Sequence, residues 1–357
     1  MARLRHGPAG RVSRRAIHLG RGGWPAGWCR PLAGLQESPF RCRGGSDHAG
    51  NLDGTQGGRS REASGGRHPM STPLADCPPP PRRRLIAGCG ALGMRVARRW
   101  LAAGDQVWGT TRNRPDQLTA AGIKPIVVDL GTGPLPPLPE VETVFWAVGF
   151  DRHSAATPHE LHVDGLTRLL NALPSRVRVV LSSSTGVWGD GEGEVVTEQT
   201  PVSPRRPSAS ALVEAEALLR SHATGPGVAL RFAGLYGPER LPRLDDLRAG
   251  RAIAADPDSW LNLLHLDDAA SVVCWAADAL SPAALYVVSD GRPQRRGNWY
   301  TRLAEITGSP PVKFATPPSS GRGGNKRADP SLLMSHLSPP LAHPDALAAI
   351  EALLGSR

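Results

Sequence analysis

From residue 85 to residue 182, short apolar runs alternate with longer stretches in which apolar residues recur at helical spacing. The short runs predict one strand starting at residue 85, a second ending near residue 112, and three more at residues 125–130, 143–148 and 177–182. Helical spacing is clearest at residues 91–101 and 159–173. Strands that are apolar along their whole length and separated by helices are typical of a parallel sheet covered on both faces. The pattern therefore predicts an α/β fold with a doubly wound parallel sheet.

Three glycines lie in the turn between the first predicted strand and the first predicted helix. Gly88, Gly90 and Gly93 have G-x-G-x-x-G spacing, which indicates dinucleotide binding when a strand precedes it and a helix follows. In such a turn the first glycine redirects the chain, the second admits a pyrophosphate, and the third lets helix and strand pack closely. The N–H groups of the helix start, at Ala91 and Leu92, are expected to face the phosphates.

The end of the second predicted strand bears on the choice of cofactor. Residues 110–112 read Thr-Thr-Arg, where an NAD-selective site usually carries an acidic residue against the ribose hydroxyls. A guanidinium suits a 2′-phosphate, so Thr111 and Arg112 favour NADP over NAD; a solvated surface Arg is the alternative. The other expected cofactor contacts end the third and fourth strands: Asp129, Leu130, Ala147 and Val148.

The positive charge of the chain is concentrated at its start. Of the net +10, residues 1–69 carry +8, from twelve Arg, no Lys and four acidic residues, which leaves +2 for the remainder. Residues 1–82 are rich in Gly, Arg, Pro and Ser without periodicity, and we expect a disordered extension there. An organelle transit peptide, a nucleic-acid arm and a segment without a role remain alternatives, and Met70 would begin a plausible shorter protein.

The cysteines and the hydropathy of the chain limit the classes of protein to which it can belong. Five Cys show no C-x-x-C pair and no metal-ligand spacing with His, so we expect no metal site and a reduced, cytoplasmic protein. No run approaches the ~18 apolar residues of a membrane helix. We expect a small-molecule substrate rather than a nucleic acid or a membrane; the oligomeric state stays open, with a homodimer as one alternative.

Five segments, in order, resemble the extended short-chain dehydrogenase/reductases, the NAD-dependent epimerase/dehydratase family. Besides the glycine turn they are SSSTGVWGD at 182–190, LRFAGLYGPER at 230–240, NLLHLDDAA at 262–270 and LYVVSD at 285–290. The resemblance covers about residues 84–310. It implies a Rossmann domain over residues 83–235 and a smaller substrate-binding part over residues 236–357, which returns one strand, at about 284–289, to the sheet.

The resemblance also implies a chemistry. Members of this family transfer hydride at C4 of the nicotinamide and move a proton with a Tyr, whose pKa is lowered by a Lys four residues further on. A Ser or Thr at the end of strand five hydrogen-bonds the reacting oxygen. Ser184 fits that position, with Thr185 beside it; a turn or capping cluster is the alternative reading of these residues.

The chain departs from the family at the Tyr-x-x-x-Lys pair. Aligned on Glu216, Ser208 takes the Tyr position and Leu212 the Lys position. A serine hydroxyl beside a leucine cannot supply the tuned acid/base, because even a phenol needs a nearby cation to act near neutral pH. Tyr236, in the loop after strand six, is a replacement candidate, with simple packing as its alternative role.

Three other side chains have an expected structural role or a role that the sequence leaves undecided. Arg231 is expected to form an ion pair under the sheet, and His265 to hydrogen-bond the backbone near Asp267. His162 stands where the family often has Asn, and its role stays open. The sequence thus supports two hypotheses: an atypical NAD(P)-dependent oxidoreductase, epimerase or dehydratase, or a catalytically silent NADP-binding sensor or scaffold of the same fold.

Overall fold

The computed structural model describes residues 80–149, 155–222, 225, 227–316 and 324–355. The chain divides into two units, Met1–Pro73 and Leu74–Arg357. All described residues belong to the second unit. The expected disordered extension, at residues 1–82, lies almost wholly outside the described residues.

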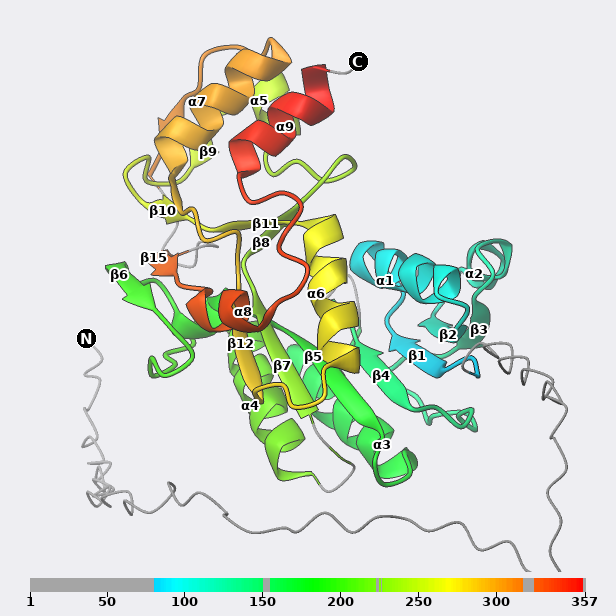
Figure 1. Cartoon of the computed structure of the whole chain (residues 1–357). Helices are drawn as coiled ribbons and strands as arrows, with labels where there is room; N and C mark the ends of the chain where they lie inside the picture. Colours follow the sequence, from blue (N-terminus) through cyan, green and yellow to red (C-terminus); the bar gives the residue numbers. More distant parts are fainter. Residues whose placement is uncertain (1–79, 150–154, 223–224, 226, 317–323, 356–357) are drawn as a thin grey trace, which may run out of the picture. The chain divides into compact units, whose positions relative to one another are not determined.

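Seven parallel strands form the central sheet, in the order β12-β7-β5-β4-β1-β2-β3 (Figure 1). The strand order reverses beside β1, which is the position where doubly wound sheets bind ligands. The predicted α/β fold with a doubly wound parallel sheet is therefore confirmed. The strands are β1 (Arg83–Ala87), β2 (Gln106–Thr111), β3 (Lys124–Val127), β4 (Thr143–Trp146), β5 (Arg178–Ser184), β7 (Gly227–Phe232) and β12 (Leu285–Val288).

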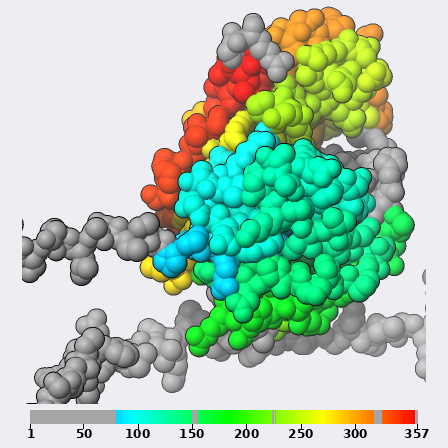
Figure 2. Space-filling view, turned by 90° about the vertical axis from the view of Figure 1, so that its right-hand side faces the viewer, coloured from blue at the N-terminus to red at the C-terminus, as the bar shows by residue number. Residues whose placement is uncertain are grey.

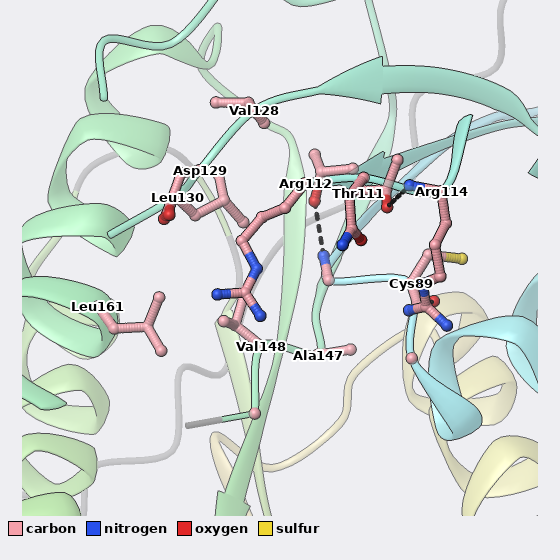
Figure 3. Close-up of a pocket in the computed structure, with 15 residues that line it drawn as sticks. Cys89, Thr111, Arg112, Arg114, Val128, Asp129, Leu130, Ala147, Val148 and Leu161 are labelled. Carbon is pink, nitrogen blue, oxygen red and sulfur yellow. Dashed lines mark hydrogen bonds between the residues drawn. The ribbon is translucent and has the colours of Figure 1, made fainter. Parts of the chain in front are cut away.

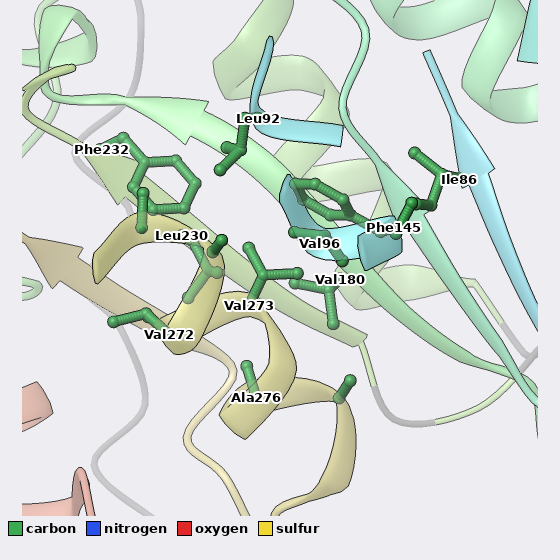
Figure 4. Close-up of a cluster of buried hydrophobic side chains, with 14 of the residues drawn as sticks. Ile86, Leu92, Val96, Phe145, Val180, Leu230, Phe232, Val272, Val273 and Ala276 are labelled. Carbon is green, nitrogen blue, oxygen red and sulfur yellow. The ribbon is translucent and has the colours of Figure 1, made fainter. Parts of the chain in front are cut away.

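Helices cover both faces of the sheet because alternate strand residues point to opposite sides. Ile86 packs in a cluster with side chains of α1 (Ala91–Ala102) and α6 (Leu266–Asp278), which Figure 4 shows. Its neighbour Leu85 packs in a second cluster, with α3 (Gly165–Ala172) and α4 (Pro207–Ser221). Figure 2 views the molecule from the side on which α1 and α2 (Pro115–Ala120) lie.

The helix expected at residues 159–173 is interrupted in the structure. It consists of a π-helical turn, η1 (Glu160–Asp164), followed by α3. Gly165 begins α3 at a point where any Cβ would collide with the carbonyl oxygen of Leu130. The helix therefore approaches the end of β3 closely, a contact that helical periodicity does not reveal.

The remaining elements follow β5 and lie outside the central sheet, apart from β7 and β12 above. Short strand pairs join β6 with β15, β8 with β11, β9 with β14, and β10 with β13. None of the described helices is long and apolar enough to span a bilayer. The elements are η2 (Thr185–Trp188), β6 (Glu192–Val196), β8 (Gly234–Tyr236), α5 (Leu244–Arg248), β9 (Ile253–Ala254), β10 (Trp260–Leu261), β11 (Leu263–His265), β13 (Gln294–Arg295), α7 (Arg296–Thr307), β14 (Phe314–Ala315), β15 (Asn325–Ala328), α8 (Ser331–His336) and α9 (Ala346–Gly355).

A buried ion pair ties α4 to the sheet. The Arg231 guanidinium of β7 donates to both carboxylate oxygens of Glu216, at 3.0 and 2.7 Å, and the Ser183 hydroxyl donates to one of them at 2.5 Å. The side chains of Glu216 and Arg231 are only 1% and 5% exposed. The same guanidinium lies 4.8 Å from the centre of the Trp188 ring. The ion pair expected for Arg231 is therefore confirmed, and it joins β5, β7, α4 and η2.

We expect Glu216→Gln to lower the free energy of unfolding by about 3–5 kcal/mol, because the buried guanidinium loses its counter-charge. Urea denaturation measures this change. Glu305→Gln is the matched control, since its partner Arg302 is exposed and that ion pair should contribute less than ~1 kcal/mol. Equal effects of the two substitutions would contradict the stabilising role of the buried pair.

Candidate cofactor and active site

A cavity of about 520 Å³ lies at the carboxyl ends of β1, β2, β3 and β4. Its wall is formed by the glycine turn after β1 and by the residues that follow the other three strands (Figure 3). This is the place where the strand order reverses, and parallel strands bring residues far apart in sequence to a single edge there.

The glycine turn is closed on two sides and open on the third. Gly88 has φ +91°, and a Cβ there would lie 2.9 Å from the Val148 Cα atom. A Cβ on Gly93 would lie 2.8 Å from the Gly88 carbonyl oxygen. At Gly90, in contrast, a Cβ would have no atom of the described chain within 4 Å. The backbone is therefore packed tightly behind the turn and leaves open space at the position expected to meet a pyrophosphate.

Helix α1 begins at this open side. Its first turn contains no acidic residue and no side-chain cap, so the N–H groups of Ala91, Leu92 and Gly93 have no intrahelical acceptor. None of these three expected contacts is among the residues that line the cavity, and Leu92 packs in the hydrophobic core. The helix start follows directly after Gly90, which does line the cavity, and its positive end would favour an anion there.

Two threonines at the end of β2 hold two turns in place, Thr110 the glycine turn and Thr111 the turn after β2. The Thr110 hydroxyl accepts a hydrogen bond from the Gly88 N–H at 2.7 Å, and the Thr111 hydroxyl accepts one from the Arg114 N–H at 3.1 Å. Thr110 was absent from the residues expected on sequence grounds. The hydroxyl at the end of the second strand was visible in the sequence, but its partner 22 residues away was not.

Two arginines border the cavity after β2. Figure 3 shows the Arg112 side chain pointing into the cavity, toward Val148 and Leu161. The Arg114 guanidinium lies 3.5 Å from the Cys89 carbonyl oxygen. Both side chains are exposed, and no acidic residue lies among those that line this end of the cavity apart from Asp129. Arg114 was not predicted from the sequence, since no motif or periodicity marks it as a cavity residue.

The residues expected after the third and fourth strands also line the cavity. The Asp129 carboxylate accepts a hydrogen bond from the Gly131 N–H at 2.9 Å, so part of its role is to fix the turn after β3. The Ala147 N–H donates to the Ala87 carbonyl oxygen at 2.8 Å, which joins β4 to the start of the glycine turn. The expected residues that the cavity brings together are Gly88, Gly90, Thr111, Arg112, Asp129, Leu130, Ala147 and Val148.

Two titratable side chains near the cavity are kept neutral. Burial raises the pKa of the Cys89 thiol to about 11, so this cysteine fills space and does not react as a thiolate near neutral pH. Burial lowers the pKa of His162 to about 4. Its Nδ1 atom has no hydrogen-bond partner in the described part of the chain, and its role stays open.

Ser184 lies at the same edge of the sheet, one strand beyond the cavity. Strand β5 pairs with β4, with Leu181 opposite Trp146, so Ser184 extends past the strand end where Ala147 and Val148 line the cavity. The Ser184 hydroxyl oxygen accepts a hydrogen bond from the Gly186 N–H at 3.1 Å. Its proton therefore remains available to a substrate oxygen. Thr185 follows at the start of η2 and is also half-buried.

Helix α4 carries the residues that align with the family's Tyr and Lys. Ser208 is half-buried in its first turn. Leu212, one turn further, packs against a cluster that contains Val187 and Trp188. Leu212, at the position where the sequence predicts the family's Lys, thus makes an apolar contact.

Tyr236 packs in a cluster of buried side chains that does not include Ser184. The Tyr236 ring is fully buried, with edge-to-face contacts to His265 and Trp299 at centroid distances of 5.2 and 6.1 Å. Burial raises the pKa of Tyr236, and its hydroxyl has no hydrogen-bond partner among the described residues. The His265 Nδ1 atom accepts a hydrogen bond from the Asp267 N–H at 3.2 Å, which confirms the structural role expected for it.

Comparison with known proteins agrees with this geometry. The model of the NAD dependent epimerase/dehydratase family matches residues 85–288. Protein YeeZ of Escherichia coli K12 is 28% identical over 277 residues, which cover 74% of this chain and 98% of YeeZ. A functionally unknown conserved protein from Silicibacter pomeroyi has a solved structure with a TM-score of 0.63 and 24% identity, covering 77% of this chain and 99% of its own.

A further solved structure is that of UDP-glucuronic acid 4-epimerase from Bacillus cereus in complex with UDP-glucuronic acid and NAD. Its TM-score is 0.63 at 17% identity, over 77% of this chain and 99% of the epimerase, and this likeness shows the fold. The open glycine turn, the uncapped helix start and the strand ends around the cavity fit a nicotinamide dinucleotide. The chain belongs to the NAD dependent epimerase/dehydratase family.

Proposed function

We propose that the protein binds NADP in the cavity and acts as an oxidoreductase, epimerase or dehydratase on a small molecule with a carbonyl or hydroxyl group. The observation that carries this proposal is the glycine turn, which is packed behind Gly88 and Gly93 but open at Gly90. Ser184 stands at the same edge of the sheet, one strand beyond the residues after β4 that line the cavity, so a dinucleotide that runs from the turn past β4 would reach its hydroxyl.

The preference for NADP over NAD is supported by Arg112. The guanidinium points into the cavity at the end of β2, where NAD-selective sites usually place a carboxylate. A planar guanidinium can bind a 2′-phosphate through two hydrogen bonds, whereas ribose hydroxyls offer it no charge.

The chemistry divides between the cofactor and three hydroxyl groups. A bound nicotinamide would supply or accept the hydride. The Ser184 hydroxyl would donate a hydrogen bond to the reacting oxygen and so orient it. Thr185 follows it in the same turn. Ser208 cannot serve as a tuned base. We assign it the role of passing a proton between that oxygen and water, because its side chain is half-buried and can reach solvent. Tyr236 is too enclosed for this scheme.

Turnover is favoured over a catalytically silent sensor or scaffold. The solved structural relatives include a protein named as an epimerase, and Ser184 retains a free proton at the expected edge. A cytoplasmic location is part of the same proposal. The two described cysteines, Cys89 and Cys274, are unpaired thiols, as is usual in a reducing compartment.

Gly90→Ala is expected to weaken NADPH binding about tenfold or more, which corresponds to ~1.4 kcal/mol, while the melting temperature stays unchanged. The folded chain has room for the methyl group, but a pyrophosphate would compete with it. Fluorescence titration with NADPH measures the effect. Gly133→Ala is the control, because a Cβ there makes ordinary contact with the Asp129 carbonyl oxygen, at 3.5 Å, outside the cavity lining. Unaltered affinity of Gly90→Ala would place the pyrophosphate elsewhere.

Arg112→Ala is expected to weaken NADPH binding by about 1.5–3 kcal/mol, the contribution of hydrogen bonds to a charged group, with little change for NADH. Parallel titrations with the two cofactors measure the selectivity. Arg98→Ala, on the exposed side of α1, removes the same charge and should leave both affinities unchanged. A uniform loss for both cofactors would show that Arg112 does not read the 2′-phosphate.

The full chain is expected to consume NADPH with at least one member of a panel of carbonyl compounds and nucleotide sugars. Ser184→Ala should then lower kcat about 100-fold, because one donor to the reacting oxygen is lost. Ser221→Ala, at the exposed end of α4, is the control. Cofactor binding without turnover across the panel would instead favour the silent protein.

A further inference from the structure

A cationic side chain and the Ser184 hydroxyl both approach Gly186. The Arg206 Nη2 atom and the Ser184 Oγ atom are 3.1 and 3.3 Å from the single point where a Cβ on Gly186 would stand. Because residue 186 is glycine, the guanidinium can lie over the backbone of η2 at this point. The hydroxyl assigned to the reacting oxygen and a fixed positive charge therefore border the same small space.

The Arg206 guanidinium has no ion-pair or hydrogen-bond partner within the described ranges, and the side chain is half-buried. Its neighbour Arg205 differs on both counts. The Arg205 side chain is 71% exposed and faces Asp190 at 3.9 Å. Holding a partly desolvated cation without a counter-charge is unfavourable in the free protein, and an anionic ligand would relieve that cost.

Other charged side chains of both signs lie near Arg206. The Lys326 Nζ atom, almost fully buried, donates to the Gly189 carbonyl oxygen at 2.6 Å. Burial lowers the pKa of Lys326 to about 8, the carboxylates of Asp190 and Glu194 oppose this shift, and Arg206 adds a smaller lowering effect. The Asp190 carboxylate faces Arg205 at 3.9 Å, and the Glu194 carboxylate accepts a hydrogen bond from the Glu192 N–H at 2.6 Å. Neither carboxylate forms an ion pair with Arg206 among the described residues.

The start of α4 adds hydrogen-bond donors. This helix has fifteen residues, Arg206 precedes it, Pro207 is its first residue, and no acidic residue lies in its first turn. The Ser208 N–H is thus one of the helix's unpaired donors, and the Ser208 hydroxyl projects from the same turn. The positive end of the helix macrodipole acts in the same direction as the guanidinium.

We propose that Arg206, with Ser184 and Ser208, forms a subsite for an anionic group of the substrate, a carboxylate or a phosphate next to the carbon that bears the reacting oxygen. This inference rests on the proposed function. Arg206 binds and orients the substrate and transfers no proton, because a guanidinium stays protonated. The cation that the family places on Tyr is absent at Leu212, and here a cation acts on the substrate itself.

The test uses the full chain saturated with NADPH and three probes at matched ionic strength: sodium malonate, sodium phosphate and sodium chloride. The melting temperature is followed as each probe is titrated. Malonate or phosphate should raise it with saturation, and chloride should not. Saturation by malonate alone indicates a carboxylate substrate, and saturation by phosphate alone indicates a phosphate ester. No saturable effect of either anion overturns the proposal.

Variants then locate the effect. Arg206→Gln should weaken probe binding at least about tenfold, equivalent to ~1.4 kcal/mol. Arg205→Gln, the same change of charge one residue earlier, should leave it unaltered, and Arg206→Lys should keep part of it. Equal losses of probe affinity in Arg205→Gln and Arg206→Gln would show that the anions respond to the general positive potential of this surface and not to a specific site.

NADPH affinity separates this proposal from the proposed function. Arg206→Gln should bind NADPH as the original chain does, and a parallel loss of cofactor would assign Arg206 to the cofactor and overturn the subsite. Failure of the original chain to bind NADPH, with saturable anion binding that depends on Arg206, would refute the proposed function and leave the subsite standing.

Discussion

The close approach of main chain to main chain at the β1–α1 turn is the constraint on which the cofactor site depends. A side chain at Gly88 would strike the backbone of Val148, and one at Gly93 would strike the carbonyl oxygen of Gly88. Only under this condition can the turn that precedes α1 pack against the residues that follow β4. The helix is fixed further along by Arg95, which donates to the Asp267 carboxylate of α6 at 3.1 Å.

A second constraint, the buried Glu216–Arg231 pair, organises the substrate side. It joins α4 to β7, and through the Ser183 hydroxyl to β5, while the guanidinium also covers Trp188 of η2. Ser184 therefore follows a residue that is held rigidly, and its own hydroxyl is left with one free proton. Because a buried charge pair tolerates little displacement, the relation between the start of α4 and the end of β5 is also fixed.

The sequence predicts that Ser208 and Leu212 stand at the family's Tyr and Lys positions, and this would change what this part of the site can do. Leu212 packs against the η2 cluster and brings no charge. Arg206, which has no partner among the described residues, is too basic to exchange a proton but well suited to hold an anion. The predicted loss of the Tyr and Lys is consistent with the proposed anion subsite. A substrate held through its own negative charge depends less on the Tyr and Lys for its orientation.

The sequence by itself determined the strands of the central sheet, the helix α1, the glycine turn and the strand ends that line the cavity, from Gly88 to Val148. These features follow from local periodicity and from the rule that parallel strands share a carboxyl edge, so no long-range contact had to be known. Tertiary structure alone decided three others. It enclosed Tyr236 between His265 and Trp299, it brought Gly165 against the Leu130 carbonyl oxygen, and it laid Arg206 over Gly186. Each depends on the distance between segments separated along the chain, which packing sets and residue order does not encode locally.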